Sequence, residues 1–178
     1  MPTSEIDCST KKGPGIQLDI QDETLMVTPM HKDSRTGGRC LLTLRASTVE
    51  QIQLTGASRV RGGALARLAE VDVGGAASLD LRGLAVPRFS LNISGAGSAR
   101  LSGKVDHLEV VVAGAANIVA KDVSATSGTL TTLGTGNISA TIHASVDATS
   151  AGAGTITIHG SPGTVNETVD GLGRIVVK

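Results

Sequence analysis

The amino-acid sequence predicts an all-β protein folded as a single-stranded, right-handed parallel β-helix with about 19 residues per coil. Glycines recur at intervals of 19, 20, 19, 20, 18 and 19 residues, which is the near-constant period of a solenoid. Apolar residues alternate with polar or small ones on both sides of these glycines, as in half-buried strands. The recurring glycines, which we interpret as corners of the coils, are Gly56, Gly75, Gly95, Gly114, Gly134, Gly152 and Gly171.

The segment before the repeats divides into a tail and a lead-in. Residues 1–15 are expected to form a flexible N-terminal tail, because KKGPG favours a turn over a strand. Residues 16–47 are expected to form a lead-in coil or N-terminal cap with three strands, IQLDI, ETLMV and CLLTL. The polar segment 31–39 is expected to be a loop. Residues 16–178 would then form a single β-helix domain.

Residues 48–178 hold seven repeat units. Each unit is expected to comprise a strand, the glycine corner, a second strand and a second corner. A unit this short cannot bury its own apolar face, so stacked coils, roughly 4.8 Å apart, must share one core. Parallel crossovers strongly prefer the right hand. Each unit also has room for a third short strand, which would carry Leu65, Leu84, Val105, Val123 or Ile142.

The pattern G-x-G at residues 95, 134, 152 and 171 resembles part of a phosphate-binding loop. A dinucleotide loop, however, occurs once, between a strand and a helix, and ends in a third glycine. Here a predicted strand follows every copy, and the Lys-Ser/Thr pair of a Walker loop is absent. We therefore interpret the glycines as corners that allow positive φ angles and close stacking, and we expect no cofactor.

Charge and composition argue against several classes of partner. Lysine plus arginine and aspartate plus glutamate both number 16, so no basic footprint for nucleic acid is expected. Phe89 is the one aromatic residue, which leaves no stacking platform for bases or sugars. The most apolar run, residues 110–120, is too short to span a bilayer as a helix. The first fifteen residues contain no apolar core of signal-peptide length.

Several stretches resemble a known family. The segments LNISGAGSARLSG, VVAGAANIVAKDV, TLGTGNISA and TSAGAGTITIHGSPGTVNETVDGLGRIVV are similar to coils of the head GIN domain, and ETLMVTP with CLLTLRASTVEQIQLTGASRV is similar to its lead-in strands. The resemblance covers roughly residues 16–178. It implies a β-helix of the auto-transporter adhesin type from the bacterial envelope, with no established catalytic residues. The implied location is the cell envelope or the exterior if a signal peptide has been removed, and the cytoplasm otherwise.

No candidate site in the sequence has a catalytic or metal-binding pattern. Asn117 and Asn137 occupy one repeat position, in line with Ser78, Ser98 and Thr155, and are expected to form a structural ladder. His143 and His159 lie in adjacent units but make an incomplete zinc site, so no metal is expected. Cys8 and Cys40 could form a disulfide or stay as two thiols. Catalytic carboxylates would have to lie together on one face. The aspartates of the repeats instead fall at different repeat positions, so no enzyme is expected. These aspartates are Asp72, Asp80, Asp106, Asp122, Asp147 and Asp170.

Val111, Val119 and Leu133 are the candidate contact surface. They occupy predicted outward positions and would form an exposed apolar spot. Such a spot can be a contact with another subunit or partner, or it can consist of unrelated surface residues.

Two functions fit these observations best. The first is a non-enzymatic, adhesin-head-like module of the cell envelope, rigid and suited to binding or self-association. Its partners would be an envelope glycan or protein, or further copies that contact the lateral face or the helix ends. The alternative is a bactofilin-like scaffold that polymerises end to end, since the last predicted coil has no visible cap.

Overall fold

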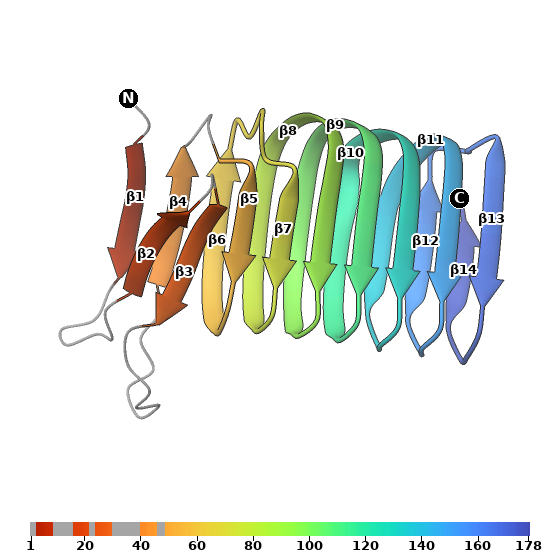
Figure 1. The fold of residues 1–178 in the computed structure, drawn as a ribbon. Helices are drawn as coiled ribbons and strands as arrows, with labels where there is room; N and C mark the ends of the chain where they lie inside the picture. Colours follow the sequence, from red (N-terminus) through yellow and green to blue (C-terminus); the bar gives the residue numbers. More distant parts are fainter. Residues whose placement is uncertain (1–2, 9–15, 22–23, 30–39, 46–48) are drawn as a thin grey trace.

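The computed structural model describes residues 3–8, 16–21, 24–29, 40–45 and 49–178. The described chain is a parallel β-solenoid (Figure 1), as the glycine period predicts. Its strands are β1 (Thr3–Cys8), β2 (Ile16–Gln21), β3 (Thr24–Pro29), β4 (Cys40–Arg45), β5 (Gln51–Leu54), β6 (Ala57–Gly63), β7 (Glu70–Val73), β8 (Ala76–Ile93), β9 (Ala96–Val112), β10 (Ala115–Thr132), β11 (Asn137–Ser150), β12 (Thr155–His159), β13 (Thr164–Val169) and β14 (Arg174–Val177).

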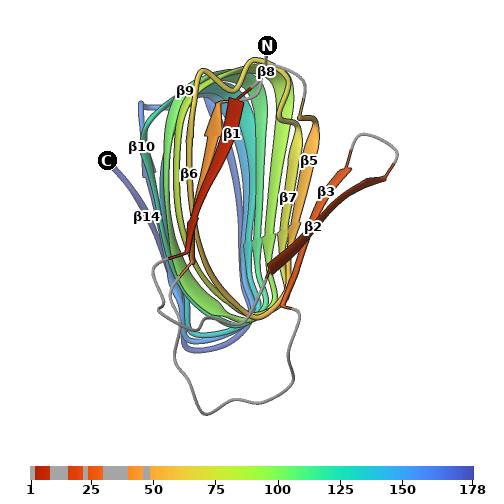
Figure 2. The same ribbon diagram turned by 90° about the vertical axis from the view of Figure 1, so that its left-hand side faces the viewer.

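Each coil has two long sides that meet at the glycine corner (Figure 2). One side, called the front face here, contains β5, β7, the C-terminal parts of β8 to β11, and β13. The other side, the back face, contains β6, the N-terminal parts of β8 to β11, β12 and β14. Neighbouring coils pair in parallel on both sides. An outward residue therefore lies on one face or the other, according to which side of the corner it occupies.

The predicted third strand is not a separate element. In the middle coils it merges with its neighbours, so that β8, β9 and β10 contain 18, 17 and 18 residues. Register shifts between Leu81 and Leu84, and between Val119 and Asp122, mark where these strands bend over the top of the coil. A bulge bends a strand without ending it. In these middle coils the expected second corner is therefore a bent strand, whereas β6 and β7, and β12 and β13, are separate strands.

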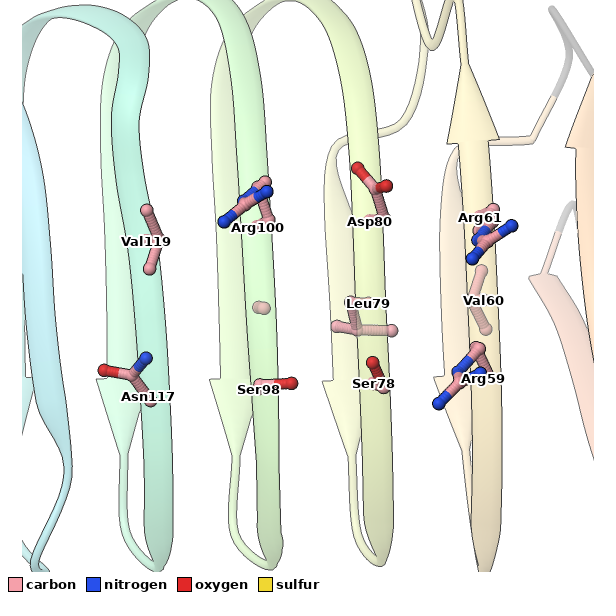
Figure 3. Close-up of a pocket in the computed structure, with 11 residues that line it drawn as sticks. Arg59, Val60, Arg61, Ser78, Leu79, Asp80, Ser98, Arg100, Asn117 and Val119 are labelled. Atoms are coloured by element: carbon pink, nitrogen blue, oxygen red, sulfur yellow. The ribbon is translucent and has the colours of Figure 1, made fainter.

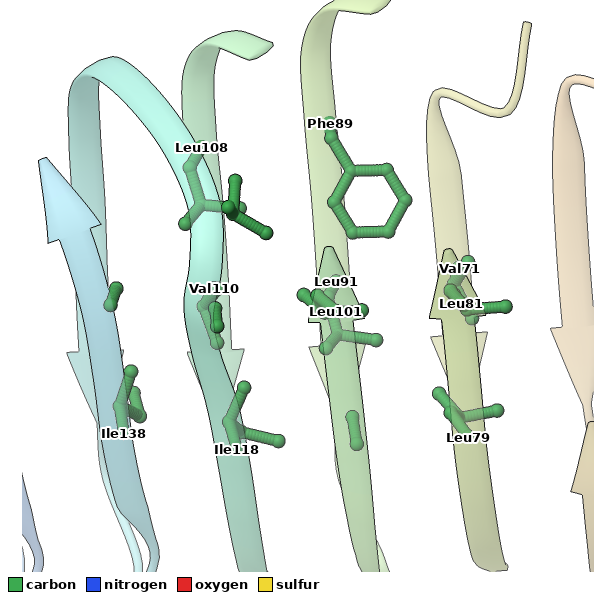
Figure 4. Packing of buried hydrophobic residues seen from close by; sticks show 14 of the residues in the cluster. Val71, Leu79, Leu81, Phe89, Leu91, Leu101, Leu108, Val110, Ile118 and Ile138 are labelled. Carbon is green, nitrogen blue, oxygen red and sulfur yellow. The ribbon is translucent and has the colours of Figure 1, made fainter. Parts of the chain in front are cut away.

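The core is one continuous stack of apolar side chains between the two faces (Figure 4). The parallel register places like positions of successive coils on top of one another, as in the row Ile118, Ile138 and Ile156. Among the described residues, Phe89 is the largest side chain that has no exposed surface. The residues expected on the third strand are also buried: Leu65, Leu84, Val105, Val123 and Ile142.

The first four strands pair with one another in antiparallel fashion and join the solenoid through parallel pairs. β2 pairs with β3 and β1 pairs with β4 in antiparallel fashion, while β3 and β4 continue onto β5 and β6. The three strands expected within residues 16–47 are therefore present. The expected tail is corrected at Thr3–Cys8, which forms β1 and covers the edge of β4, with Cys8 in register with Cys40. The rest of that tail and the predicted loop 31–39 lie outside the described residues.

The C-terminal coil exposes apolar side chains. Leu172 is 92% exposed, Val169 is 50% exposed and Val177 is 43% exposed. They belong to β13, β14 and the corner between these strands, which is the last described coil.

The described residues contain no helix with the length and hydropathy needed to cross a membrane.

Candidate functional site

The corner glycines lie in a stack along one edge of the solenoid. At Gly114, for example, an added Cβ would lie 1.9 Å from the carbonyl oxygen of Gly95 in the preceding coil. That oxygen accepts a hydrogen bond from the Ala115 amide at 3.0 Å. Among the seven, positive φ angles occur only at Gly56 (87°) and Gly171 (153°). Close stacking, rather than backbone conformation, is therefore the main reason for glycine at these corners.

The predicted apolar spot does not form a single surface. Val111 lies on the front face in β9, and Val119 lies on the back face in β10. Leu133 lies at the corner after β10 and is 53% exposed. Alternation in the sequence identified these residues as outward, but it did not tell on which side of the coil each one lies.

The polar ladder aligns as predicted on the back face. Asn117 is in register with Asn137 and Ser98, and the row continues to Ser78 and Thr155. The row belongs to the strands that follow the corners, so its side chains share one outward direction. It supplies hydroxyl and amide groups to the surface of the back face.

The two histidines in adjacent coils are not part of a metal cluster in the structure. His143 is exposed, whereas His159 is half-buried with Nε2 3.1 Å from Ser139 Oγ. Burial lowers the pKa of His159, and the charges of Lys121 and Lys178 lower it further. Within the described ranges, no group of three or more His, Cys, Asp or Glu side chains is arranged to hold a metal ion.

A shallow hollow of about 390 Å³ lies on the back face near the N-terminal end of the solenoid (Figure 3). We call it the arginine hollow, after Arg59 and Arg61 of β6 and Arg100 of β9, whose side chains are all exposed. Four adjacent strands contribute to it, so parallel pairing holds its backbone on all sides. The remaining lining residues are Val60, Ser78, Leu79, Asp80, Ser98, Ala99, Asn117 and Val119.

The outward side chains of the arginine hollow form two rows along the solenoid axis (Figure 3). The parallel register places one member of each row on each coil. The first row alternates in charge before ending in an apolar residue, and the second has one charge followed by uncharged polar groups. The first row is Arg61, Asp80, Arg100 and Val119; the second is Arg59, Ser78, Ser98 and Asn117.

Asp80 is the acidic group in the middle of the arginine hollow. Its two carboxylate oxygens accept hydrogen bonds from Nε and Nη2 of Arg82, at 2.9 and 2.8 Å. The bond to Arg82 is the main cause of its lowered pKa, and the charges of Arg82, Arg100 and Arg61 act in the same direction. Asp80 is therefore ionised at neutral pH. The three arginines that name the hollow form no ion pair with any residue that the structure describes.

The front face carries the opposite charge at the same level of the solenoid. Glu70 and Glu109 lie in one row with Ser90 between them, and Asp72 is adjacent. Asn92 donates a hydrogen bond to Asp72 at 2.9 Å. Partial burial raises the pKa of Glu70, and the nearby Asp72 and Glu109 raise it further. The formal net charge of zero thus conceals a basic hollow on the back face and an acidic patch on the front face.

The groups of the arginine hollow are suited to binding anions rather than to catalysis. Among the described residues that line it, there is no histidine, lysine or cysteine to act as base or nucleophile. Asp80 is engaged by Arg82. Guanidinium groups instead present a planar fork of donors that matches carboxylate and sulfate oxygens. Sequence reasoning did not identify this site, although Arg61, Asp80 and Arg100 share one outward position, five residues after their corner glycines.

Comparisons with known proteins agree with the resemblance stated above. The family model described as "putative auto-transporter adhesin, head GIN domain" matches residues 3–162. No curated protein matches the sequence. The chain is similar to the crystal structure of a putative adhesin from Bacteroides fragilis, with a TM-score of 0.82 and 24% sequence identity. The alignment covers 92% of this chain and 76% of that one, and this likeness is one of fold.

Proposed function

Because the chain belongs to the head GIN domain family of putative auto-transporter adhesins, we propose that it is a rigid binding module of the cell envelope whose arginine hollow holds an anionic glycan. The family description and that of the structural neighbour name an adhesin and not an enzyme. The family also favours an envelope or extracellular location.

The observation that carries the proposal is the grouping of Arg59, Arg61 and Arg100 on adjacent coils of one face. Their backbone positions are fixed by the parallel ladder, so binding has to order only the three exposed side chains, at about 0.5–1.5 kcal/mol each. Each guanidinium can hold a carboxylate or sulfate with two hydrogen bonds. The Ser78 and Ser98 hydroxyls in the second row can bond to sugar hydroxyls.

The exposure of these arginines sets the expected strength of binding. An ion pair at an exposed site contributes about 0.2–1 kcal/mol and is weakened by salt. Three such pairs give weak binding by one copy of the chain. Adhesion therefore depends on several copies that bind one polymer or one surface, because linked sites raise the effective affinity without new contacts.

The proposal is tested by retention of the purified chain on dextran sulfate beads, with uncharged dextran beads as the matched matrix. We expect salt-sensitive retention on dextran sulfate alone, and its loss in the triple variant Arg59→Gln, Arg61→Gln, Arg100→Gln. Arg174→Gln is the matched control, because Arg174 continues the row of Arg59 at the far end of the back face. Equal retention of the triple and control variants, or no retention of the wild type, would contradict the proposal.

End-to-end assembly is a second candidate, favoured by one observation. The last described coil exposes Val169, Leu172 and Val177, and β14 is an edge strand of the sheet. Edge strands with apolar neighbours are templates for pairing with another chain. Light scattering over a wide concentration range separates the two candidates, since only the scaffold requires growth into filaments.

A further inference from the structure

We propose, resting on the proposed function, that the glycan is an alternating acidic polysaccharide with one carboxylate per disaccharide, and that Asp80 determines this specificity. The polysaccharide would lie along the solenoid axis over the first row of the arginine hollow. Arg61 and Arg100 would hold the acidic sugars, and Asp80 would face the uncharged sugar between them.

The spacing of the row supports an alternating ligand. Arg61, Asp80 and Arg100 are in register on three successive coils. Adjacent strands lie roughly 4.8 Å apart, so the backbone positions of the two arginines are about 9.6 Å apart along the axis. This distance is close to the length of one disaccharide in an extended polysaccharide. Both guanidinium groups can therefore bind equivalent carboxylates of one polysaccharide molecule.

The charge between the arginines supports the same ligand. Asp80 is held in its ionised form by Arg82, with two hydrogen bonds of 2.9 and 2.8 Å. A polymer with a carboxylate on every sugar would place one of them against this aspartate, where like charges repel. A neutral sugar would instead offer hydroxyl donors, which the free lone pairs of the carboxylate can accept.

The uncharged groups beside the row fit a sugar better than a nucleic acid. Ser78 and Ser98 lie two residues before Asp80 and Arg100 on the same strands, so their hydroxyls face the same side. The arginine hollow contains no aromatic side chain, so neither a base nor a sugar can stack there, and a ligand is held by ion pairs and hydrogen bonds. A nucleic acid also has a phosphate on every nucleotide, which Asp80 would oppose as it opposes a polyuronate.

The test compares two fluorescently labelled probes of equal length by anisotropy at low salt. Hyaluronan fragments carry one carboxylate per disaccharide, and polygalacturonate fragments carry one on every sugar. We expect the wild type to bind hyaluronan more tightly. In Asp80→Asn, polygalacturonate binding should rise about fivefold, the effect of removing a like charge about 4 Å away in water. Hyaluronan binding should change less than twofold.

Two control variants separate the charge of Asp80 from other effects. Asp80→Asn also releases Arg82, so the double variant Asp80→Asn, Arg82→Gln is measured in parallel and is expected still to raise polygalacturonate binding. Asp122→Asn removes an exposed carboxylate elsewhere on β10 and is expected to leave both affinities unchanged. A rise in polygalacturonate binding that occurs in Asp80→Asn, persists in the double variant and is absent in Asp122→Asn supports the specificity role.

Other outcomes overturn the inference. Equal binding of both probes by the wild type, or an equal rise for both in Asp80→Asn, would refute it. If the arginine-dependent retention on dextran sulfate persists in that case, the proposed function stands. A further outcome is that the protein forms salt-sensitive dimers. If these dimers are lost in the triple arginine variant, and also when Glu70, Asp72 and Glu109 are replaced, the acidic patch of a second copy occupies the hollow. That result would overturn both proposals.

Discussion

At the scale of single residues, the corner glycines show how tightly the coils are stacked. An added Cβ at Gly75, Gly95 or Gly134 would lie 2.0–2.2 Å from the carbonyl oxygen of the preceding corner glycine. These are backbone atoms, and they cannot rotate away as a side chain would. Glycine is required here because a hydrogen-bonded carbonyl occupies the space of the side chain.

Gly114→Ala is therefore expected to lower the free energy of unfolding by roughly 1–3 kcal/mol or more, the usual cost of overpacking. The new Cβ would force apart the Gly95 carbonyl and the Ala115 amide that bonds to it. Urea denaturation measures the change. Gly63→Ala is the matched control, because nothing lies within 4 Å of a Cβ added there. Equal stabilities of the two variants would contradict this account of the corners.

At the scale of single elements, the charged groups of the front face show how one strand influences the next. Glu70 of β7 and Glu109 of β9 occupy one outward row, with Ser90 of β8 between them. Parallel register brings these like charges to the same side. The raised pKa of Glu70 follows from its partial burial and from this proximity to Asp72 and Glu109.

The pH dependence of stability is expected to reflect this arrangement. A carboxyl whose folded-state pKa is raised stabilises the fold while protonated, and this contribution is lost as pH rises through that pKa. Glu70→Gln should therefore raise the free energy of unfolding more at pH 7 than at pH 4, by about 0.5 kcal/mol. Denaturation at both pH values tests this, with Glu167→Gln, an exposed carboxylate on β13, as control. A gain of equal size at both pH values would argue against it.

At the scale of the whole molecule, stability in a solenoid comes from contacts between neighbouring coils. A middle coil has two neighbours and the last described coil has one. One row of the core allows a middle coil to be compared with the last described coil at the same residue type. The row consists of Ile118, Ile138, Ile156 and Ile175. Ile118 has no exposed surface, whereas Ile175 is partly buried.

Ile118→Ala is expected to cost about 2–5 kcal/mol, as for other large-to-small changes in a full core. Ile175→Ala should cost less than half as much, because one side of its coil lies open. Chemical denaturation of both variants under the same conditions measures the ratio. Equal losses would mean that the last coil is as well covered as the middle ones.

The sequence by itself determined the repeat and its consequences. The spacing of the corner glycines predicted the coil length, and alternation separated core residues such as Ile118 from outward residues such as Asn117. These features are local, because every coil must satisfy the same stacking rule. The parallel register of the polar row, from Ser78 to Thr155, followed from the same period.

Only the tertiary structure decided how the outward residues are distributed. Val111 and Val119 are both outward in the alternation, yet the corner between them places them on opposite faces. Arg61, Asp80 and Arg100 share one repeat position, but only the folded structure shows that Arg82 binds Asp80 and that the two arginines form no ion pair with any described residue. β1 likewise depends on the edge of β4, a distant contact. Local patterns record whether a residue points outward, whereas a surface forms only when distant coils pair side by side.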